Sequence, residues 1–160
     1  MVCGNTGSTG ENCVCSVLRA IVDAQDQVSP TSGCTVSCEK SIQELLNGVS
    51  PASTSPNTIP VILYCDCNPF LGTGVRVRTT GGAQHLECIQ SFVFRVNDVD
   101  DNCCASLELL EVKGGPNPAN PCKQFEGAKP EDIKTTGICI TVDLCCFCAV
   151  TCLEPVTLAL

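Results

Sequence analysis

The sequence predicts a mainly β fold: an antiparallel β-sandwich or barrel-like domain with an N-terminal amphipathic helix. Two observations support this prediction. Apolar residues recur at helical spacing before residue 30, and from Ile59 onward they recur at every second position in short runs separated by turn-forming residues. Strands at short spacing after one or two helices are typical of antiparallel sandwiches and barrels. The 160 residues suffice for one domain, which we place at residues 13–160.

The N-terminal part is predicted to hold a flexible tail and two helices. Residues 1–12 are mostly Gly, Ser, Thr and Asn, which is typical of a flexible tail. Between about residues 13 and 28 the apolar side chains follow the spacing of an amphipathic helix. A second, short helix is predicted from about Cys38 to Asn47, because its apolar residues are followed by Gly48 as a stop signal.

Strands are predicted from about residue 59 onward, where β-forming residues dominate the apolar runs. The last run is longer than a typical strand of about five or six residues, so a bulge or bend within it is expected. The predicted strands are PVILYC (60–65), VRVRTT (75–80), SFVFRV (91–96), CASLELLEV (104–112) and a strand within ICITVDLCCFCAVTCL (138–153).

Sixteen cysteines, several times an ordinary share, are the strongest chemical signal in the chain. In the last predicted strand, the two-residue period places Cys146, Cys148 and Cys152 on the apolar, core-facing side. The same period places Cys139 and Cys145 on the outward side. A bend within the run would reverse the assignment of the residues that follow it.

Cysteines close together in this sequence are poor partners for one another. An adjacent pair such as Cys103-Cys104 would distort the peptide between its members, and a C-x-C pair on an extended strand aims its Cβ atoms apart. Such cysteines are expected to find partners elsewhere, some of them in other chains. The C-x-C pairs are Cys13/Cys15, Cys65/Cys67 and Cys146/Cys148.

The charge balance disfavours several classes of partner. Nine Lys and Arg stand against seventeen Asp and Glu, for a net charge of −8. Nucleic-acid binding requires clustered cations, and anionic membrane surfaces repel an acidic chain. We therefore expect no nucleic-acid or membrane partner, but other proteins or further copies of the chain. Neither a secretory signal nor an apolar run of roughly 18 residues is visible, so no export signal or membrane span is predicted.

Metal, redox and hydrolytic sites are weakly supported. Zinc sites prefer two C-x-x-C pairs or cysteines combined with paired histidines, whereas this chain has one C-x-x-C, Cys145 to Cys148, and a single histidine, His85. A redox C-x-x-C requires a following helix, and a cysteine hydrolase requires a general base. The sequence therefore predicts no catalytic, cofactor-binding or metal-ligating residue, no cofactor and no small-molecule substrate. A cysteine-rich zinc-binding protein is the alternative.

The chain contains four distinctive segments in a fixed order: GENCVCSVLRAIVDAQD (10–26), IPVILYC (59–65), FVFRVNDVDDNCCASLELL (92–110) and ICITVDLCCFCAVTCL (138–153). Together they resemble the CotY/CotZ/ExsY family of cysteine-rich spore coat and exosporium proteins from endospore-forming bacilli. The resemblance runs from about Cys13 to Leu153. The motif cysteines that it covers are Cys13, Cys15, Cys104, Cys139, Cys146, Cys148 and Cys152.

The resemblance implies a structural protein of the outer coat or exosporium, and not an enzyme. Members of this family self-assemble into ordered two-dimensional arrays, often of hexameric units, which disulfides cross-link. The implied partners are further copies of the chain and other spore coat or exosporium proteins. The resemblance also implies synthesis without a signal peptide in the mother-cell cytoplasm and a final location at the spore surface.

Two sets of cysteines are candidates for such cross-links. The candidates for intermolecular disulfides lie on the predicted tail, at the start of the first helix or on the outward face of the last strand, and they are Cys3, Cys13, Cys15 and Cys145. The candidates for core, intramolecular disulfides are Cys104, Cys139, Cys146, Cys148 and Cys152. The connectivity, the coat layer and the form of the assembly, whether sheet, filament or ring, are left open by the sequence.

Overall fold

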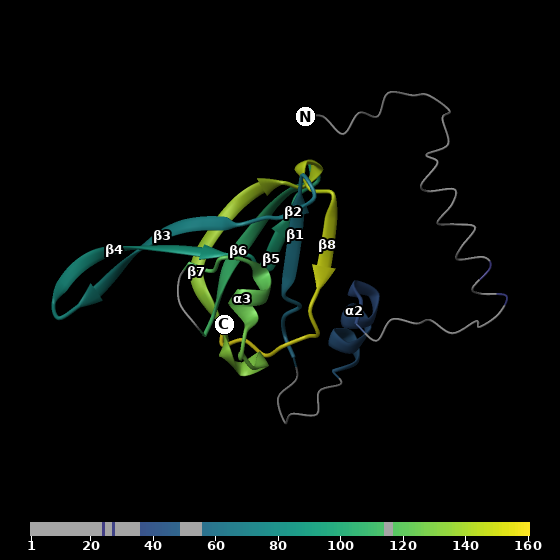
Figure 1. Ribbon diagram of the computed structural model, residues 1–160, viewed down its shortest axis with the longest axis horizontal. Coiled ribbons are helices and arrows are strands. Elements are labelled where there is room, and N and C mark those ends of the chain that lie inside the picture. Colours follow the sequence, from purple (N-terminus) through teal and green to yellow (C-terminus); the bar gives the residue numbers. More distant parts are fainter. Residues whose placement is uncertain (1–23, 25–26, 28–35, 49–55, 114–116) are drawn as a thin grey trace. The chain divides into compact units, whose positions relative to one another are not determined.

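A computed structural model describes residues 24, 27, 36–48, 56–113 and 117–160 of the chain (Figure 1). The chain divides into two units, Met1–Thr35 and Val36–Leu160, and the elements named below belong to the second. Of the predicted N-terminal helix, Ala24 and Gln27 are described, and both are helical. The rest of that helix and the tail predicted at residues 1–12 lie outside the described residues.

Helix α2 spans Cys38–Asn47, so the short helix predicted from the sequence is confirmed. Its start is capped by Ser37, whose side chain accepts a hydrogen bond from the backbone N–H of Lys40 at 3.2 Å. Its end is capped by Gly48, which has a φ of 63°, a left-handed conformation that favours glycine. The helix therefore begins and ends where the local sequence supplies the caps.

Two antiparallel sheets make up about half of the described chain (Figure 1). The larger has the order β2-β1-β5-β6-β7, with β8 also paired to β1, and the smaller is the β3–β4 hairpin. The mainly β prediction is confirmed, and within the second unit the sheets form a half-barrel. The strands are β1 (Val61–Cys65), β2 (Asn68–Pro69), β3 (Gly72–Thr80), β4 (Ala83–Ser91), β5 (Phe94–Val99), β6 (Cys104–Val112), β7 (Ile133–Asp143) and β8 (Ala149–Cys152).

Two of the predicted strands are divided in the structure. The run SFVFRV is interrupted between β4 and β5, and the final long run separates into β7, the 3₁₀ helix η2 (Leu144–Cys146) and β8. Strict alternation would separate Phe92 and Phe94 from Val93, yet all three are buried. They can all be buried because the chain bends between the two strands and both faces of the larger sheet are covered.

Each face of the larger sheet carries its own apolar cluster. Leu109 and Leu110, neighbours on β6, are both fully buried because successive strand residues point to opposite faces. The pairing of β6 with β7 also shifts its register between Glu108 and Leu110, next to these two leucines. The first cluster is Val61, Leu63, Ile89, Phe94, Ala105, Leu107 and Leu109, and the second is Val93, Leu110, Val112, Ile133, Val156 and Leu158.

A buried polar network attaches helix α3 (Pro121–Phe125) to the sheet. The Oε1 atom of Gln124 accepts a hydrogen bond from the backbone N–H of Phe92 at 2.9 Å, and its Nε2 donates to Ser91 Oγ at 2.8 Å. Ser91 Oγ in turn donates to the carbonyl oxygen of Leu110 at 2.6 Å. These partners compensate the cost of burying the amide, so this short helix is held in place.

The β3–β4 hairpin packs on the larger sheet at its base and extends away from it toward the Gly81-Gly82 turn (Figure 1). Two glycines permit the close approach at the base. A Cβ atom added at Gly72 would lie 2.5 Å from Cε1 of Phe94, and one added at Gly74 would overlap the side chain of Ile138. Larger residues at either position would therefore push the hairpin off the sheet.

Candidate functional site

One disulfide joins α2 to β8. Cys38 is the first residue of α2 and Cys152 the last of β8, and their Cα atoms lie 4.9 Å apart although 114 positions separate them in sequence. Ser41 on the same helix is buried, and its Oγ donates a hydrogen bond to the carbonyl oxygen of Leu153 at 2.8 Å. A covalent bond and a partly buried hydrogen bond together hold α2 against the end of β8.

Seven further cysteines gather at one end of the larger sheet, which we call the cysteine end. They come from three connections that meet there: the β1–β2 turn, the β5–β6 turn and the segment of η2 between β7 and β8 (Figure 1). None of the seven is disulfide-bonded in this structure, and five are exposed while Cys65 and Cys104 are half-buried. The seven are Cys65, Cys67, Cys103, Cys104, Cys145, Cys146 and Cys148.

Long-range backbone pairing produces the cysteine end. The β6–β7 register places Cys104 opposite Asp143, and the backbone N–H of Leu144 donates to the carbonyl oxygen of Cys103 at 2.9 Å. Cys103 has a φ of 61° and Cys67 in the β1–β2 turn also has a φ of 61°, a left-handed conformation that is uncommon outside glycine. The thiols are thus presented by tight turns whose positions the sheet defines.

Carboxylates lie among these thiols. The charge of Asp100 is the main cause of the raised pKa of Cys104, with burial and Asp143 adding to it. A hydrogen bond and the charge of Asp143 raise the pKa of Cys145. Burial, followed by the charge of Asp66, raises the pKa of Cys65. Because only the thiolate attacks disulfides or alkylating agents, these thiols react slowly near neutral pH and faster as the pH rises.

Replacing Asp143 by asparagine is expected to make Cys145 more reactive. The change removes the negative charge and lowers the raised pKa of Cys145, so more thiolate is present at a pH below that pKa. We expect alkylation of Cys145 by iodoacetamide to become about three- to tenfold faster at pH 7.5, measured by peptide mass spectrometry.

The matched control is Asp101→Asn in the β5–β6 turn, a residue that does not contribute to the raised pKa of Cys145. It should leave the alkylation rate unchanged. Equal rates in Asp143→Asn and the unmodified chain at every pH would contradict the electrostatic account.

Three more unpaired cysteines are exposed away from the cysteine end. Cys88 lies on β4, Cys122 on α3 and Cys139 on β7. The Sγ atom of Cys139 accepts a hydrogen bond from Nδ2 of Asn97 at 3.4 Å. Exposed thiols are therefore present on both sheets and on α3.

The structure departs from the sequence prediction at the end of the last strand. Cys146 and Cys148 are exposed, although strand alternation placed them in the core; Cys139 and Cys145 are exposed as well. Alternation ends at η2, where the side chain of Asp143 accepts a hydrogen bond from the backbone N–H of Cys145 at 2.9 Å and caps a 3₁₀ turn.

The cysteines predicted to form cross-links fall into three groups: one is in a disulfide, several are free thiols and three lie outside the described residues. Cys152 is in a disulfide with Cys38, a partner that no local signal in the sequence indicates, because the bond depends on the docking of α2. The other core candidates, Cys104, Cys139, Cys146 and Cys148, carry free thiols. Cys145 is exposed at the cysteine end, and Cys3, Cys13 and Cys15 lie outside the described residues. Their disulfide roles remain predictions.

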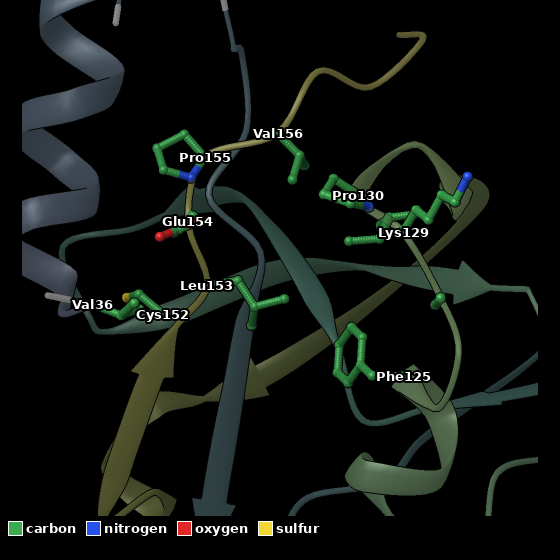
Figure 2. Close-up of a pocket in the computed structure, with 11 residues that line it drawn as sticks. Val36, Phe125, Lys129, Pro130, Cys152, Leu153, Glu154, Pro155 and Val156 are labelled. Atoms are coloured by element: carbon green, nitrogen blue, oxygen red, sulfur yellow. The ribbon is translucent and has the colours of Figure 1, made fainter. Parts of the chain in front are cut away.

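A pocket of about 370 Å³ lies between the segment that follows α3 and the segment that follows β8 (Figure 2). Its walls are largely apolar, with Phe125, Pro130 and Leu153 among the residues that face it, and Lys129 and Glu154 are its charged residues. The cysteine that lines it, Cys152, is already in a disulfide. This lining provides no nucleophile paired with a base.

Histidine and metal chemistry receive no support from the described part of the chain. His85 is exposed on β4, opposite Arg78 in the hairpin. Among the described residues no group of three or more His, Cys, Asp or Glu is arranged to hold a metal ion. The helices in that part also include none that is long and apolar enough to cross a membrane.

Comparison with known proteins identifies the family. The sequence profile of the family described as Spore coat protein Z matches residues 1–155. The chain is also 26% identical, over 152 residues covering 90% of each chain, to the spore coat protein Z of Bacillus subtilis (strain 168). No solved structure matches it. Since the profile covers nearly the whole sequence, the chain belongs to the spore coat protein Z family, whose members are structural proteins of the bacterial spore coat.

Proposed function

We propose that this spore coat protein is a self-assembling building block that forms ordered oligomers or arrays, which disulfides within and between chains then stabilise. The observation that carries the proposal is the number of unpaired thiols. Ten cysteines of the described residues are free, and eight of these are exposed. A single folded domain does not need so many exposed thiols, whereas cross-linking between copies does.

An apolar strip on the β3–β4 hairpin supports association before cross-linking. Val77 and Leu86 are register partners, and Val75 is the partner of Cys88, so these four side chains share one face of the hairpin. Val75, Val77 and Leu86 are 56%, 60% and 79% exposed. On the opposite face, Arg76 contacts Glu87 at 2.8 Å. The exposed strip with its thiol is a surface that a second copy would cover.

The edges of the larger sheet offer further contacts. Among the described residues β8 pairs with β1 alone, and β7 is the last strand on the other side of the sheet order. Exposed edge strands can pair with strands of another chain. Repeated contacts of this kind, together with the hairpin strip, would set the geometry of an array, because closed or lattice symmetry requires complementary patches on every copy.

The proposed order is association first and oxidation second. Non-covalent contacts position the copies, and thiols near the contacts then form bonds at high effective concentration. Within this scheme Cys3, Cys13, Cys15 and Cys145 remain the proposed intermolecular set. Cys104, Cys139, Cys146 and Cys148 join Cys152 as the proposed intramolecular set.

The proposal also covers location and partners. We place the assembled protein in the outer coat or exosporium, after synthesis in the mother-cell cytoplasm without a signal peptide. Its proposed partners are further copies of itself, in units that we expect to be hexameric, and other spore coat or exosporium proteins. Membership of the spore coat protein Z family supports this placement.

Electron microscopy and non-reducing gels of the purified protein test the proposal. Without reductant we expect ordered particles or sheets and ladders of high mass, and reductant should remove the ladders. A chain that is monomeric with and without reductant would overturn the proposal. Stoichiometric zinc after purification without reductant would favour the metal-binding alternative instead.

Charged residues in the hairpin strip should prevent assembly. We expect Val77→Lys combined with Leu86→Lys to lower the assembled fraction at least about tenfold, measured by sedimentation in reductant, because burying two ammonium groups is costly. The matched control is Thr79→Lys combined with Gln84→Lys. Thr79 and Gln84 are register partners on the same face of the hairpin as Val77 and Leu86, but both are polar. Equal loss in both variants would mean that added charge alone, and not the apolar strip, decides the result.

A further inference from the structure

Strands β1 and β8 bring two free cysteines, Cys65 and Cys148, close together at the cysteine end. The two strands lie side by side (Figure 1), and their register pairs Val61 with Cys152 and continues through Tyr64 and Ala149. The ladder ends there: Cys65 is the last residue of β1, and Cys148 immediately precedes β8. The two residues are thus neighbours at the end of the ladder rather than neighbours in sequence.

Backbone hydrogen bonds show where Cys148 lies along β1. The N–H of Leu153 donates to the carbonyl oxygen of Pro60 at 2.9 Å, which flanks the Val61–Cys152 pair and makes it a non-hydrogen-bonded pair. Pairs of this kind alternate with hydrogen-bonded ones along an antiparallel ladder, and the N–H of a residue in such a pair points away from the partner strand. The N–H of Cys148 instead points toward β1 and bonds to Tyr64, so Cys148 leaves the alternation of the ladder and lies beside Tyr64, the residue before Cys65.

Direct contacts keep Cys148 beside β1 although it lies just before β8. Its backbone N–H donates to the carbonyl oxygen of Tyr64 at 2.9 Å, and its Sγ lies 3.3 Å from the same oxygen. Cys146 and Cys148 are also among the charged neighbours that raise the pKa of Cys65, which indicates that these thiols are near one another.

We propose that Cys65 and Cys148 form an intramolecular disulfide when the spore surface becomes oxidising. The bond would tie the start of β8 to β1, while Cys38–Cys152 already ties its end to α2. This inference deepens the proposed function and relies on it only for the oxidising conditions, because the bond lies within one chain. It also removes Cys148 from the thiols available to other copies.

Oxidised glutathione, a disulfide oxidant, can drive the step. The Cys148 thiolate attacks one sulfur of the glutathione disulfide, so a mixed disulfide forms and one glutathione thiolate leaves. The Cys65 thiolate then attacks the Cys148 sulfur, which forms the Cys65–Cys148 bond and releases the second glutathione thiolate. The two protons from the cysteines end on the two glutathiones, whose disulfide has taken up two electrons. Cys148 reacts first because it is exposed, whereas Cys65 is half-buried.

Peptide mapping of the oxidised full chain tests the inference. The protein is purified in reductant, diluted, oxidised in a glutathione buffer, blocked with N-ethylmaleimide and digested with chymotrypsin without reduction. Cleavage after Tyr64 and Phe147 separates Cys65 from the rest of β1 and Cys148 from Cys146. We expect the peptide that begins at Cys65 to be linked to the one that begins at Cys148, with fragment ions that place the bond on these two residues.

Two controls make each outcome decisive. In a mixture of nitrogen-15-labelled and unlabelled chains, a bond within one chain gives no mixed-isotope product. The Cys148→Ser variant should lose the Cys65 linkage at least about tenfold, whereas Cys146→Ser should retain it within about twofold. Two results would overturn the inference if the Cys38–Cys152 disulfide has formed in the same sample. In the first, Cys65 carries N-ethylmaleimide and was therefore still a free thiol. In the second, Cys65 is linked to Cys146. A chain that forms this bond but stays monomeric at high concentration would instead count against the proposed assembly alone.

Discussion

Replacing Phe94 by alanine is expected to lower the free energy of unfolding by about 3–5 kcal/mol, because the change leaves a cavity in a core that cannot fully collapse. Phe94 is completely buried on β5, and its ring stacks on Phe70 with centroids 5.7 Å apart. Gly72 approaches the same ring, so the base of the β3–β4 hairpin also rests on it. Urea denaturation of the reduced chain measures the effect.

The matched control for Phe94→Ala is Leu86→Ala in the hairpin strip. Leu86 is 79% exposed, so its truncation should change the free energy of unfolding of the isolated chain by no more than about 0.5 kcal/mol. The two variants therefore separate the folding core from the surface proposed for assembly. A loss below about 1 kcal/mol for Phe94→Ala would show that the hairpin base and the sheet can close over the space left by the ring.

Removing the Cys38–Cys152 disulfide is expected to have the second large effect. The bond closes a loop with a sequence separation of 114 residues, for which loop-closure entropy predicts a loss of roughly 4–5 kcal/mol in the free energy of unfolding. Measured losses for native disulfides are about 2–5 kcal/mol. Denaturation of Cys38→Ser combined with Cys152→Ser, compared with the oxidised parent chain, measures the difference.

Two comparisons test whether the loss comes from this disulfide. Cys122→Ser removes an exposed thiol on α3 that is not in a disulfide, and it should leave the stability of the oxidised chain nearly unchanged. Under reductant, the double variant and the parent chain should differ by less than about 1 kcal/mol, because neither then has the bond. A parent chain equally stable with and without reductant would show that α2 is held mainly by its packing and by the Ser41–Leu153 hydrogen bond.

Local signals were sufficient for several elements. Ser37 and Gly48 set the two ends of α2. A side-chain cap and a left-handed glycine each end a helix through contacts with residues only a few positions away in sequence. CASLELLEV became β6 over its full length, since the alternation of apolar residues matches a sheet that has partners on both sides. β4 was missed because polar residues occupy most of the hairpin, where the strands are stabilised by pairing with one another rather than by burial.

The sequence by itself determined the mainly β class, the limits of α2 and the spore coat resemblance, because composition, caps and strand period are properties of neighbouring residues. Only the tertiary structure decided which cysteines meet. Cys38 reaches Cys152 through the docking of a helix, and the cysteine end forms where three turns converge. The exposure of Cys146 depends on one cap, from Asp143 to the N–H of Cys145, that interrupts strand alternation. Disulfide chemistry requires distances of a few ångströms between residues far apart in sequence, and the register of the folded sheet sets those distances.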